Sequence, residues 1–557
     1  KQNTIIFEEK MMKKIIAIQI MLLMLGTIIS CNKSSDVSIM NSHSTLVELY
    51  HDWRAFQGDL FTDGVPDYSD GRMKKQYDEF PVYENRLANF DTTGWSIPHR
   101  IDYHLVLAEM NGLDFDHRVI KPWKRSPAFY GIVWDSQSDT PAHEGSVAHG
   151  LVELWEYDYP LSQADAEKLT QGLRTVPPFL AQAKINLTGN ARDLWRGGIY
   201  RMKSQTSALT NLSKKTVGTS DALTAAINDA IIATNDFVAW LEKELPSKEG
   251  KSGIGINNYN WYLKNVHLVS YSWKEIETMM RRELVRAHSS LKLEEHRNQD
   301  LPPLIPMASK EEYDKKTHTS VTEFISLLED RDIVTMKDYM DQALRERISP
   351  YSPIEPREFF SEVIFHDPMV MRTHFYHWFD LARMRDEPHS SPIRSNPLLY
   401  NIWDSRSEGL ATGMEEMMMH AGLFDHHPRA RELFHILLAQ RAARALGDLM
   451  MHANKWDIDQ AVDFTSRNTP RNWLRQDGRT VVFEQHLYLQ QPSYGTTYLV
   501  GKIQIERLMT DRAIQLREGF TLKGFMDEIN QVGLIPASMM YWEMTGDDEH
   551  LHEMLYN

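Results

Sequence analysis

Two histidines three positions apart, His374 and His377, are the first residues whose type and spacing suggest chemistry. On a helix they would lie about 60° apart on one face, close enough to bind one divalent ion together. Neutral imidazole is a common metal ligand, and near neutral pH it also serves as a general acid or base. The aromatic residues around the pair fit equally well with a buried helix whose histidines only form hydrogen bonds. The sequence leaves both alternatives open.

A second segment places Glu408 and Glu415 two helical turns apart, among small and apolar residues. The two carboxylates would lie on nearly the same face of a helix. Burying a carboxylate in such surroundings is costly unless it is paired or bound to a metal. The segment therefore predicts either a metal site or an internal ion-pair network.

A third segment carries polar side chains along one helical stripe, at spacings of three or four residues. Its members are Arg441, Arg444, Asp448, His452 and Trp456. Asp448, one turn before His452, could hold the imidazole in a single tautomer, as an acid/base or oxyanion-stabilising histidine requires. A structural ladder of ion pairs that includes Arg444 is the alternative.

The elements that must position these side chains show helical periodicity, with apolar residues every three or four positions. Long helices are predicted over 221–245, with Ser220 as N-cap, over 272–291, which opens with a capping box, and over about 428–451. Strand-like alternation is scarce, and 480–489 is the only segment considered as a strand. The predicted fold class is all-α, a large multi-helical fold with two lobes and a central cleft.

Three segments rich in glycine, lysine or proline interrupt the helical pattern. They are residues 248–255, 301–306 and 349–356. These breaks and the positions of the motifs divide the chain into a predicted N-terminal helical lobe, 31–270, and a C-terminal helical lobe, 271–557. The candidate residues described above all lie in the C-terminal lobe.

Residues 1–30 have the pattern of an export signal. Two lysines precede the apolar run 15–29, which is too short to span a bilayer comfortably. The run ends in Ile-Ile-Ser-Cys, which resembles the lipobox at which a lipoprotein signal is cut and its cysteine acylated. We therefore expect an exported protein, held to the periplasmic or outer-membrane side of a bacterial envelope only through lipid on Cys31. An ordinary signal with a chance cysteine is the alternative, and residues 1–10, which contain no methionine, resemble translated upstream sequence.

Composition restricts the classes of partner. Cys31 is the single cysteine among 557 residues, so the fold relies on its core and not on internal disulfides. Hydrophobic residues make up 42% of the chain, an ordinary share for a globular protein. The net charge of −16 argues against nucleic acid and anionic lipid surfaces as partners. Solubility alone is a sufficient reason for the excess of acidic residues.

Taken in order, the motifs resemble the C-terminal half of the domain of unknown function 885 family, a group of bacterial, metallopeptidase-like, largely helical proteins. The similarity covers roughly residues 270–545. Order and spacing agree with the family in three segments. The first is Glu408-Gly409 with Glu415, and the second runs from Arg441 and Arg444 through Asp448 and His452 to Trp456. The third is Pro492 with Tyr498 and Gly501.

One departure from the family pattern bears on activity. Members that look like working metallopeptidases carry His-Glu-x-x-Pro-Gly-His-His before the Glu-Gly segment, where the Glu would activate water. An ungapped comparison puts Met371-Arg372 on the leading His-Glu, and a gapped one puts His374 on the leading His, so the Glu is missing either way. His143-Glu144 with His149 copies the lost spacing, but it lies far upstream and is interpreted as coincidence.

Together the motifs and the resemblance imply an envelope-anchored, metal-dependent hydrolase of small peptide-like substrates. The expected metal is a divalent ion, with zinc as first choice, held by His374, His377 and Glu408. The other expected roles are a substitute base at Glu415, an imidazole at His452 oriented by Asp448, oxyanion stabilisation by His452 and Tyr498, and substrate binding by Arg444. The competing prediction is a catalytically degenerate relative that binds peptides or glycans, and a purely structural envelope protein ranks last.

Overall fold

The computed structural model describes residues 41–555, so the predicted signal segment and the lipidation site Cys31 lie outside the described residues. Within this range the chain is mostly helical, which confirms the all-α prediction. Strand is limited there to two short pairs. They are antiparallel β1 (Phe61–Thr62) with β2 (Val65–Pro66) and parallel β3 (Val133–Trp134) with β4 (Val152–Glu153).

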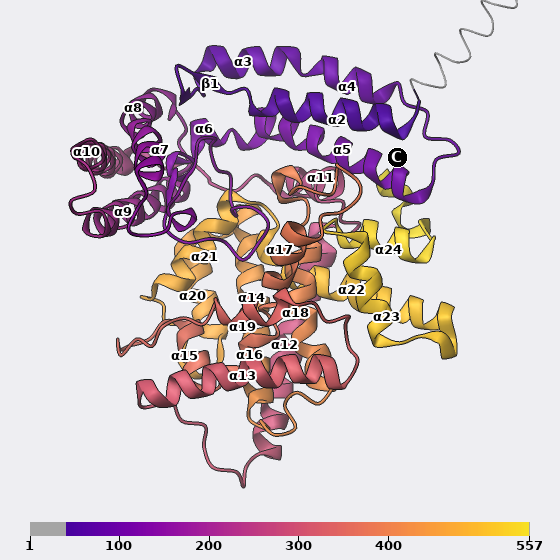
Figure 1. The fold of residues 1–557 in the computed structure, drawn as a ribbon. Helices are drawn as coiled ribbons and strands as arrows, with labels where there is room; N and C mark the ends of the chain where they lie inside the picture. Colours follow the sequence, from indigo (N-terminus) through magenta and orange to yellow (C-terminus); the bar gives the residue numbers. More distant parts are fainter. Residues whose placement is uncertain (1–40, 556–557) are drawn as a thin grey trace, which may run out of the picture.

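The helices of the first half form a layer across one end of the molecule and a bundle beside it (Figure 1). The layer contains α2 (His43–Gly58), α3 (Asp70–Glu79), α4 (Pro81–Ala88) and α5 (Ile97–Phe115). The bundle contains α7 (Gln163–Arg174), α8 (Val176–Asn186), α9 (Arg192–Lys215) and α10 (Asp221–Glu244). Two shorter helices, α6 (Pro122–Arg125) and α11 (Ile256–Asn265), complete this half.

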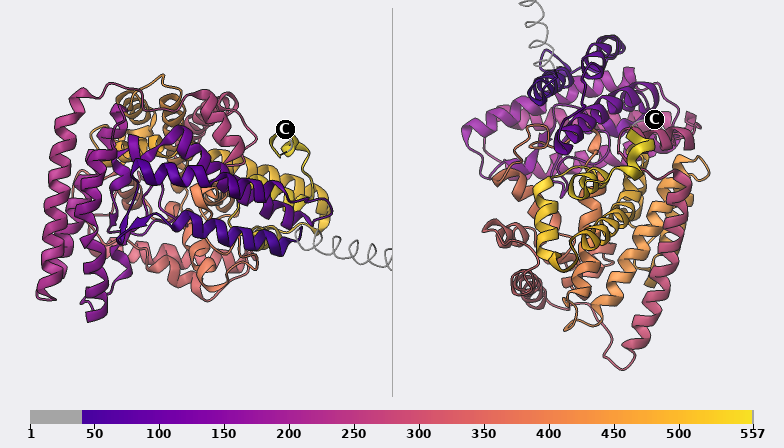
Figure 2. Two further views of the ribbon diagram at one scale, coloured as in Figure 1. Left: turned by 90° about the horizontal axis from the view of Figure 1, so that it is seen from above. Right: turned by 90° about the vertical axis from the view of Figure 1, so that its right-hand side faces the viewer.

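The helices of the second half extend away from that layer, as the side view in Figure 2 shows. The long ones are α12 (Trp273–Arg297), α13 (Lys310–Asp330), α17 (Tyr376–Asp386), α18 (Asp404–His420), α19 (Ala430–His452), α20 (Ile458–Asn468), α21 (Arg479–Gln490), α22 (Tyr494–Leu516), α23 (Leu522–Val532) and α24 (Ala537–Thr545). The short ones are α14 (Tyr339–Arg345), α15 (Phe359–His366), α16 (Met369–Arg372) and α25 (His552–Leu555). No helix within 41–555 has the length and apolar character needed to cross a membrane.

Local sequence signals account for the helix ends. The Ser220 hydroxyl caps α10 by accepting from the amide of Leu223, and Ser272 forms the predicted capping box with Glu275 at the start of α12. The segment considered as a strand, 480–489, is helical and lies in α21, so that prediction is wrong. Its β-branched start imitates a strand, but the segment is a helix that packs against α9, α19 and α20, and its residues 484–489 are all buried.

Most buried apolar side chains fall into two clusters. The smaller one includes Phe179 and Trp195 of the bundle α7–α10, together with side chains from α3, α6 and both sides of β3. The larger one joins Trp53 of α2 and Leu105 of α5 to the helices after residue 270. Packing therefore links helices on both sides of residue 270. The connection between β3 and β4, residues 135–151, reaches from the smaller cluster to the second half of the chain.

Helices α18 and α22 approach so closely that two glycines are required where they cross. An ideal Cβ on Gly501 would lie 2.0 Å from the carbonyl oxygen of Ser405, and one on Gly409 would lie 2.5 Å from the Gly501 backbone. Real Cβ atoms do not approach a backbone atom so closely. The two bare backbones bring Glu408, on α18, next to the tyrosines of α22.

Replacing Gly501 with alanine should destabilise the protein by at least about 3 kcal/mol, because the new methyl group would push α18 and α22 apart. Chemical denaturation monitored by circular dichroism measures this loss. Gly413→Ala is the matched control on α18, since its nearest neighbour is the flexible end of Met417 at 3.7 Å and no loss is expected. Equal stability of the two variants would contradict the close backbone contact.

Candidate metal centre

The three predicted metal ligands meet in the interior. His374 lies in the turn between α16 and α17, His377 in the first turn of α17, and Glu408 on α18. The Nε2 atoms of His377 and His374 lie 3.2 and 4.0 Å from Oε2 of Glu408. The two imidazole rings face each other edge to face, with centroids 5.0 Å apart. All three residues are buried, so this arrangement is not a chance meeting of exposed acidic side chains.

Second partners orient both imidazoles. Nδ1 of His377 lies 3.1 Å from the hydroxyl of Ser407, and Nδ1 of His374 lies 3.1 Å from a carboxylate oxygen of Glu415. A guanidinium nitrogen of Arg441 also lies 3.3 Å from this Nδ1 and would need a lone pair there. We assign the proton to Nδ1 because the contact with the Glu415 carboxylate is the shorter one, and this leaves the Nε2 lone pair on the side of Glu408. Metal-binding histidines usually have such a partner behind them.

The contacts of Glu415 do not fit its predicted role as the substitute base. Both of its oxygens accept hydrogen bonds from the guanidinium of Arg441, at 2.6 and 2.7 Å. Burial raises the pKa of the Glu415 carboxyl, but Arg441 and His374 outweigh burial and lower it. A carboxylate held in this way keeps its charge and orients His374 instead of exchanging protons with a substrate.

The donor set and its spacing fit a divalent ion. The nitrogen and oxygen atoms that the three residues offer all lie within 4.8 Å of one another. Ligands about 2.0–2.1 Å from a tetrahedral zinc ion lie roughly 3.3 Å apart, so small side-chain movements would suffice to close the site. Two imidazoles and one carboxylate are also the protein ligands of one common class of catalytic zinc site.

Without a metal, His377 and Glu408 neutralise each other. Burial lowers the pKa of His377, but the Glu408 carboxylate outweighs burial and raises it to about 9. Burial raises the pKa of Glu408, but His377 outweighs that effect and lowers it to about 2. A divalent ion would replace the proton on His377, because a metal needs the neutral imidazole.

Two tyrosines of α22 border Glu408. The hydroxyl of Tyr494 donates to Oε1 of Glu408 at 2.5 Å, and the hydroxyl of Tyr498 donates to that of Tyr494 at 3.1 Å. Tyr498 was predicted for this site, whereas Tyr494 was missed although it lies one turn earlier on the same face. The guanidinium of Arg444 lies 4.0 Å from the Tyr498 ring centre and is paired with Glu484, so it supports Tyr498 and is not free to bind substrate.

A third carboxyl, Glu144, reaches the site from the connection between β3 and β4. Its Oε1 lies 3.3 Å from the Tyr494 hydroxyl. Burial raises the pKa of Glu144 to about 7, and the negative charges of Asp139 and Glu408 add to the rise. The neighbouring His143 stacks on Trp134 and contacts Glu153, and His149 stacks on Tyr68, so neither histidine joins the cluster.

Sequence reasoning dismissed the segment around Glu144 because it lies more than 200 residues before the other site residues. The copied His-Glu spacing is indeed no metal motif. The segment was nevertheless the one available signal, since its glutamate lies 3.3 Å from the Tyr494 hydroxyl that donates to Glu408.

Asp448 and His452 do not reach the cluster, which corrects their predicted roles. Nε2 of His452 lies 2.8 Å from the carbonyl oxygen of Tyr488, and burial lowers the pKa of this histidine to about 4. Asp448 lies 3.8 Å from that Nε2, too far for a hydrogen bond, and packs under the first turn of α22. The pair supports the helix that carries Tyr494 and does not face a substrate.

A cleft of about 790 Å³ lies beside the cluster, and none of His374, His377 and Glu408 lines it. Glu144 and Asp139 line one side of it, and Phe375 and Trp378, which flank the two histidines in sequence, line another. The cluster itself lies beneath these residues, with Glu408 only 1% exposed. Glu144 is thus the carboxyl that borders both the cleft and the buried site.

A family model described as a bacterial protein of unknown function (DUF885) matches residues 52–351 and 377–544. The chain belongs to the DUF885 family. The match extends to residue 52, so the resemblance expected for 270–545 was too narrow and the N-terminal helices belong to the DUF885 fold as well. The match leaves out 352–376, the segment that contains His374.

Two solved structures share the fold. One is described as a putative lipoprotein of unknown function from Shewanella oneidensis, with a TM-score of 0.64, 15% sequence identity, and coverage of 90% of this chain and 97% of that one. The other is a putative lipoprotein from Colwellia psychrerythraea, with a TM-score of 0.64, 14% identity, and coverage of 91% and 99%. No curated protein matches the chain.

Arg441→Met should destabilise the protein by about 3 kcal/mol, because it leaves the buried Glu415 carboxylate with His374 as its one partner and no positive guanidinium beside it. Urea denaturation measures the loss. The double variant Glu415→Gln/Arg441→Met should recover much of it, since no uncompensated charge remains.

The control is Arg385→Met, which removes an exposed pair with Asp386 and should cost less than about 1 kcal/mol. A similar small effect for Arg441→Met would show that the buried pair does not hold the charge of Glu415.

Proposed function

We propose that this DUF885 protein is a metal-dependent hydrolase of peptide-like substrates. The observation that carries the proposal is the buried convergence of His374, His377 and Glu408, with Glu415 behind one imidazole and Ser407 behind the other. Packing alone does not explain why two imidazoles and a carboxylate share one interior point with separate orienting partners. A zinc ion bound there would supply a Lewis acid and lower the pKa of a bound water toward about 7.

Glu144 takes the role of general base. Its pKa of about 7 lets it accept a proton near neutral pH, and it borders both the cleft and the site. Its link to Tyr494 also gives the proton a partner, because a protonated Glu144 can donate to the tyrosine oxygen. Glu144 thus replaces Glu415, which Arg441 holds in the charged form.

The tyrosines take the role of oxyanion donors. The hydroxyls of Tyr494 and Tyr498 form a short chain that ends on Glu408. A negative oxygen that develops on a scissile carbonyl beside Glu408 would compete for the proton that Tyr494 now donates to this carboxylate, and the hydroxyl is already held at that point. The aromatic walls of the cleft, Phe375 and Trp378, suit the apolar side chains of a peptide.

We also propose that the protein is exported and anchored in the envelope through lipid on Cys31. The sequence signal at Ser30-Cys31 supports this, and two solved proteins of the same fold are described as putative lipoproteins. The far-side location fits a degradative or scavenging role on short peptides, and the net charge of −16 disfavours nucleic acid as the substrate.

One observation favours the second candidate, a peptide- or glycan-binding relative without catalysis. His377 and Glu408 form a complete ion pair with each other, so the buried charges are balanced without a metal. In that case the aromatic cleft would remain as a binding surface.

Elemental analysis of the purified chain distinguishes the hydrolase from the non-catalytic binding protein. The hydrolase predicts about one zinc ion per chain, retained through gel filtration, and loss of that ion in His377→Ala or Glu408→Ala. His318→Ala, an exposed histidine on α13, is the control and should keep the metal. A metal-free protein whose stability does not change when zinc is added would support the binder instead.

Glu144→Gln should reduce kcat for peptide cleavage by about 10²–10⁴-fold while the zinc content stays unchanged. Wild-type activity should rise with pH and level off above an apparent pKa at or below about 7, because the base must be ionised and a bound cation would lower its pKa. The acid limb of the pH profile should disappear in the variant.

Asp135→Asn, which changes an exposed carboxyl in the same cleft, is the matched control and should keep both kcat and the acid limb. An unchanged acid limb in Glu144→Gln would assign the base elsewhere.

A further inference from the structure

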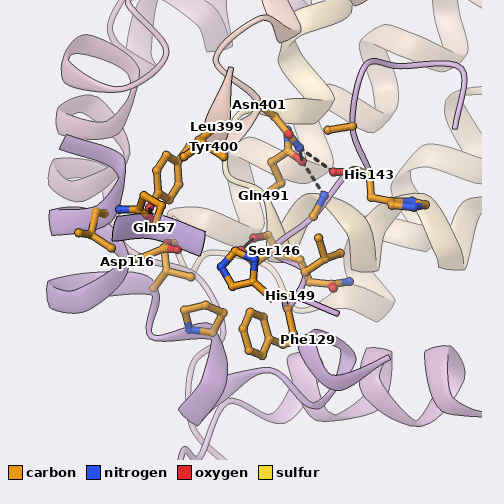
Figure 3. A pocket seen from close by; sticks show the side chains of 18 of the residues that line it. Gln57, Asp116, Phe129, His143, Ser146, His149, Leu399, Tyr400, Asn401 and Gln491 are labelled. Carbon is orange, nitrogen blue, oxygen red and sulfur yellow. Dashed lines mark hydrogen bonds between the residues drawn. The ribbon is translucent and has the colours of Figure 1, made fainter. Parts of the chain in front are cut away.

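A second cavity lies on the other side of the segment that carries Glu144. It has a volume of about 520 Å³ and is enclosed by the N-terminal helices, by residues 145–151 and by the turn 397–401 (Figure 3). His143, Val147 and Gln490 border both this cavity and the cleft at the metal centre. The volume falls within the range of small-molecule sites.

One carboxyl in this cavity has no partner. Asp116 begins a π-helix, Asp116–Ile120, that continues α5. The half-buried side chain lines the cavity, and its carboxylate forms no hydrogen bond and no ion pair with any residue between 41 and 555. Its partial withdrawal from water raises the pKa of Asp116 to about 7. A carboxylate that is partly withdrawn from water without a positive partner costs stability, so its charge is open to a cationic ligand in the cavity.

Aromatic residues line the same cavity as Asp116. Tyr68, Tyr262 and Tyr400 are among them, and besides burial the charge of Asp116 raises the pKa of each of their hydroxyls. Each hydroxyl contacts another partner, and none lies within hydrogen-bond distance of the Asp116 carboxylate. These partners are the amide of His149, the imidazole of His267 and the side-chain oxygen of Gln57.

The wall next to the cavity is held in a strained conformation. Tyr400 and Asn401 both have positive φ, 57° and 52°, which a tyrosine rarely adopts. The Tyr400 ring packs against Gly112, where an ideal Cβ would lie only 2.3 Å from the ring. The amide nitrogen of Asn401 donates to the carbonyl of His143 and to Gln491, as the dashed lines in Figure 3 indicate. The fold thus fixes Tyr400 in this position.

We propose that this cavity binds a small organic cation, with its ammonium group against Asp116 and its apolar body among Tyr68, Tyr400 and Phe129. A carboxylate inside an aromatic box is the combination that recognises an ammonium ion, through charge and through the faces of the rings. An anion would be repelled, and a neutral ligand would leave Asp116 uncompensated. The site is separate from the metal centre and does not depend on the proposed hydrolase.

Calorimetric titration of the full chain with three probes of one shape tests the charge preference. The probes are 2-phenylethylamine, 2-phenylethanol and phenylacetate. We expect the amine to bind at least about tenfold more tightly than the alcohol, and phenylacetate to bind least. Equal affinities for the amine and the alcohol, or no binding of the amine at about 10 mM, would overturn the proposal.

Asp116→Asn locates the site. It should reduce the affinity for the amine to within about twofold of that for the alcohol, and without ligand it should raise the melting temperature, because the uncompensated charge is gone. Asp114→Asn is the matched control, because Asp114 is already paired with Arg118 and Tyr77 outside the cavity, and it should leave amine binding unchanged. Full affinity for the amine in Asp116→Asn would overturn the assignment. If that variant does not fold, the comparison of the three probes on the wild-type protein still decides.

Discussion

The central constraint in this structure is the burial of the Glu408 carboxylate. A charge with 1% exposure is stable only if positive or donating groups surround it, and here His377, Tyr494 and, farther off, His374 do so. Glu415 then holds His374, and Arg441 holds Glu415, so the compensation extends through successive layers into α19. Burying so many charged side chains costs free energy that apolar packing would not cost. The network therefore favours a function that uses the charge of Glu408.

Helix packing explains how the network becomes possible. Gly409 and Gly501 let α18 and α22 touch backbone to backbone, which brings a carboxylate of one helix within reach of the tyrosines of the other. The segment 135–151, which belongs to the N-terminal half of the chain, covers Glu408 and these tyrosines. It carries Glu144 on the cleft side and borders the Asp116 cavity on the other, so one connection between two short strands contributes to two chemically different sites.

The sequence predicted the all-α class and the candidate ligands, because helical periodicity and costly buried carboxylates are local signals. It could not predict roles that depend on distant contacts. Glu415 resembled a free base until Arg441 was seen to pair with it, and the stripe spacing of Asp448 and His452 did not reveal that the imidazole bonds to a backbone carbonyl. Glu144 was missed because nothing local indicates that a loop so far upstream covers the site. The β-branched start of α21 imitated a strand because propensity carries no information on packing.

X-ray absorption at the zinc edge, on protein reconstituted with one equivalent of zinc, tests whether His374, His377 and Glu408 bind the ion. We expect a first shell of nitrogen and oxygen only, at about 2.0–2.1 Å, with the outer-shell scattering of two imidazoles. Loss of the scattering of one imidazole in the His374→Ala variant would show that His374 is one of the two ligands. A shell that contains sulfur, or one without imidazole scattering, would contradict the convergence of His374, His377 and Glu408 on a metal.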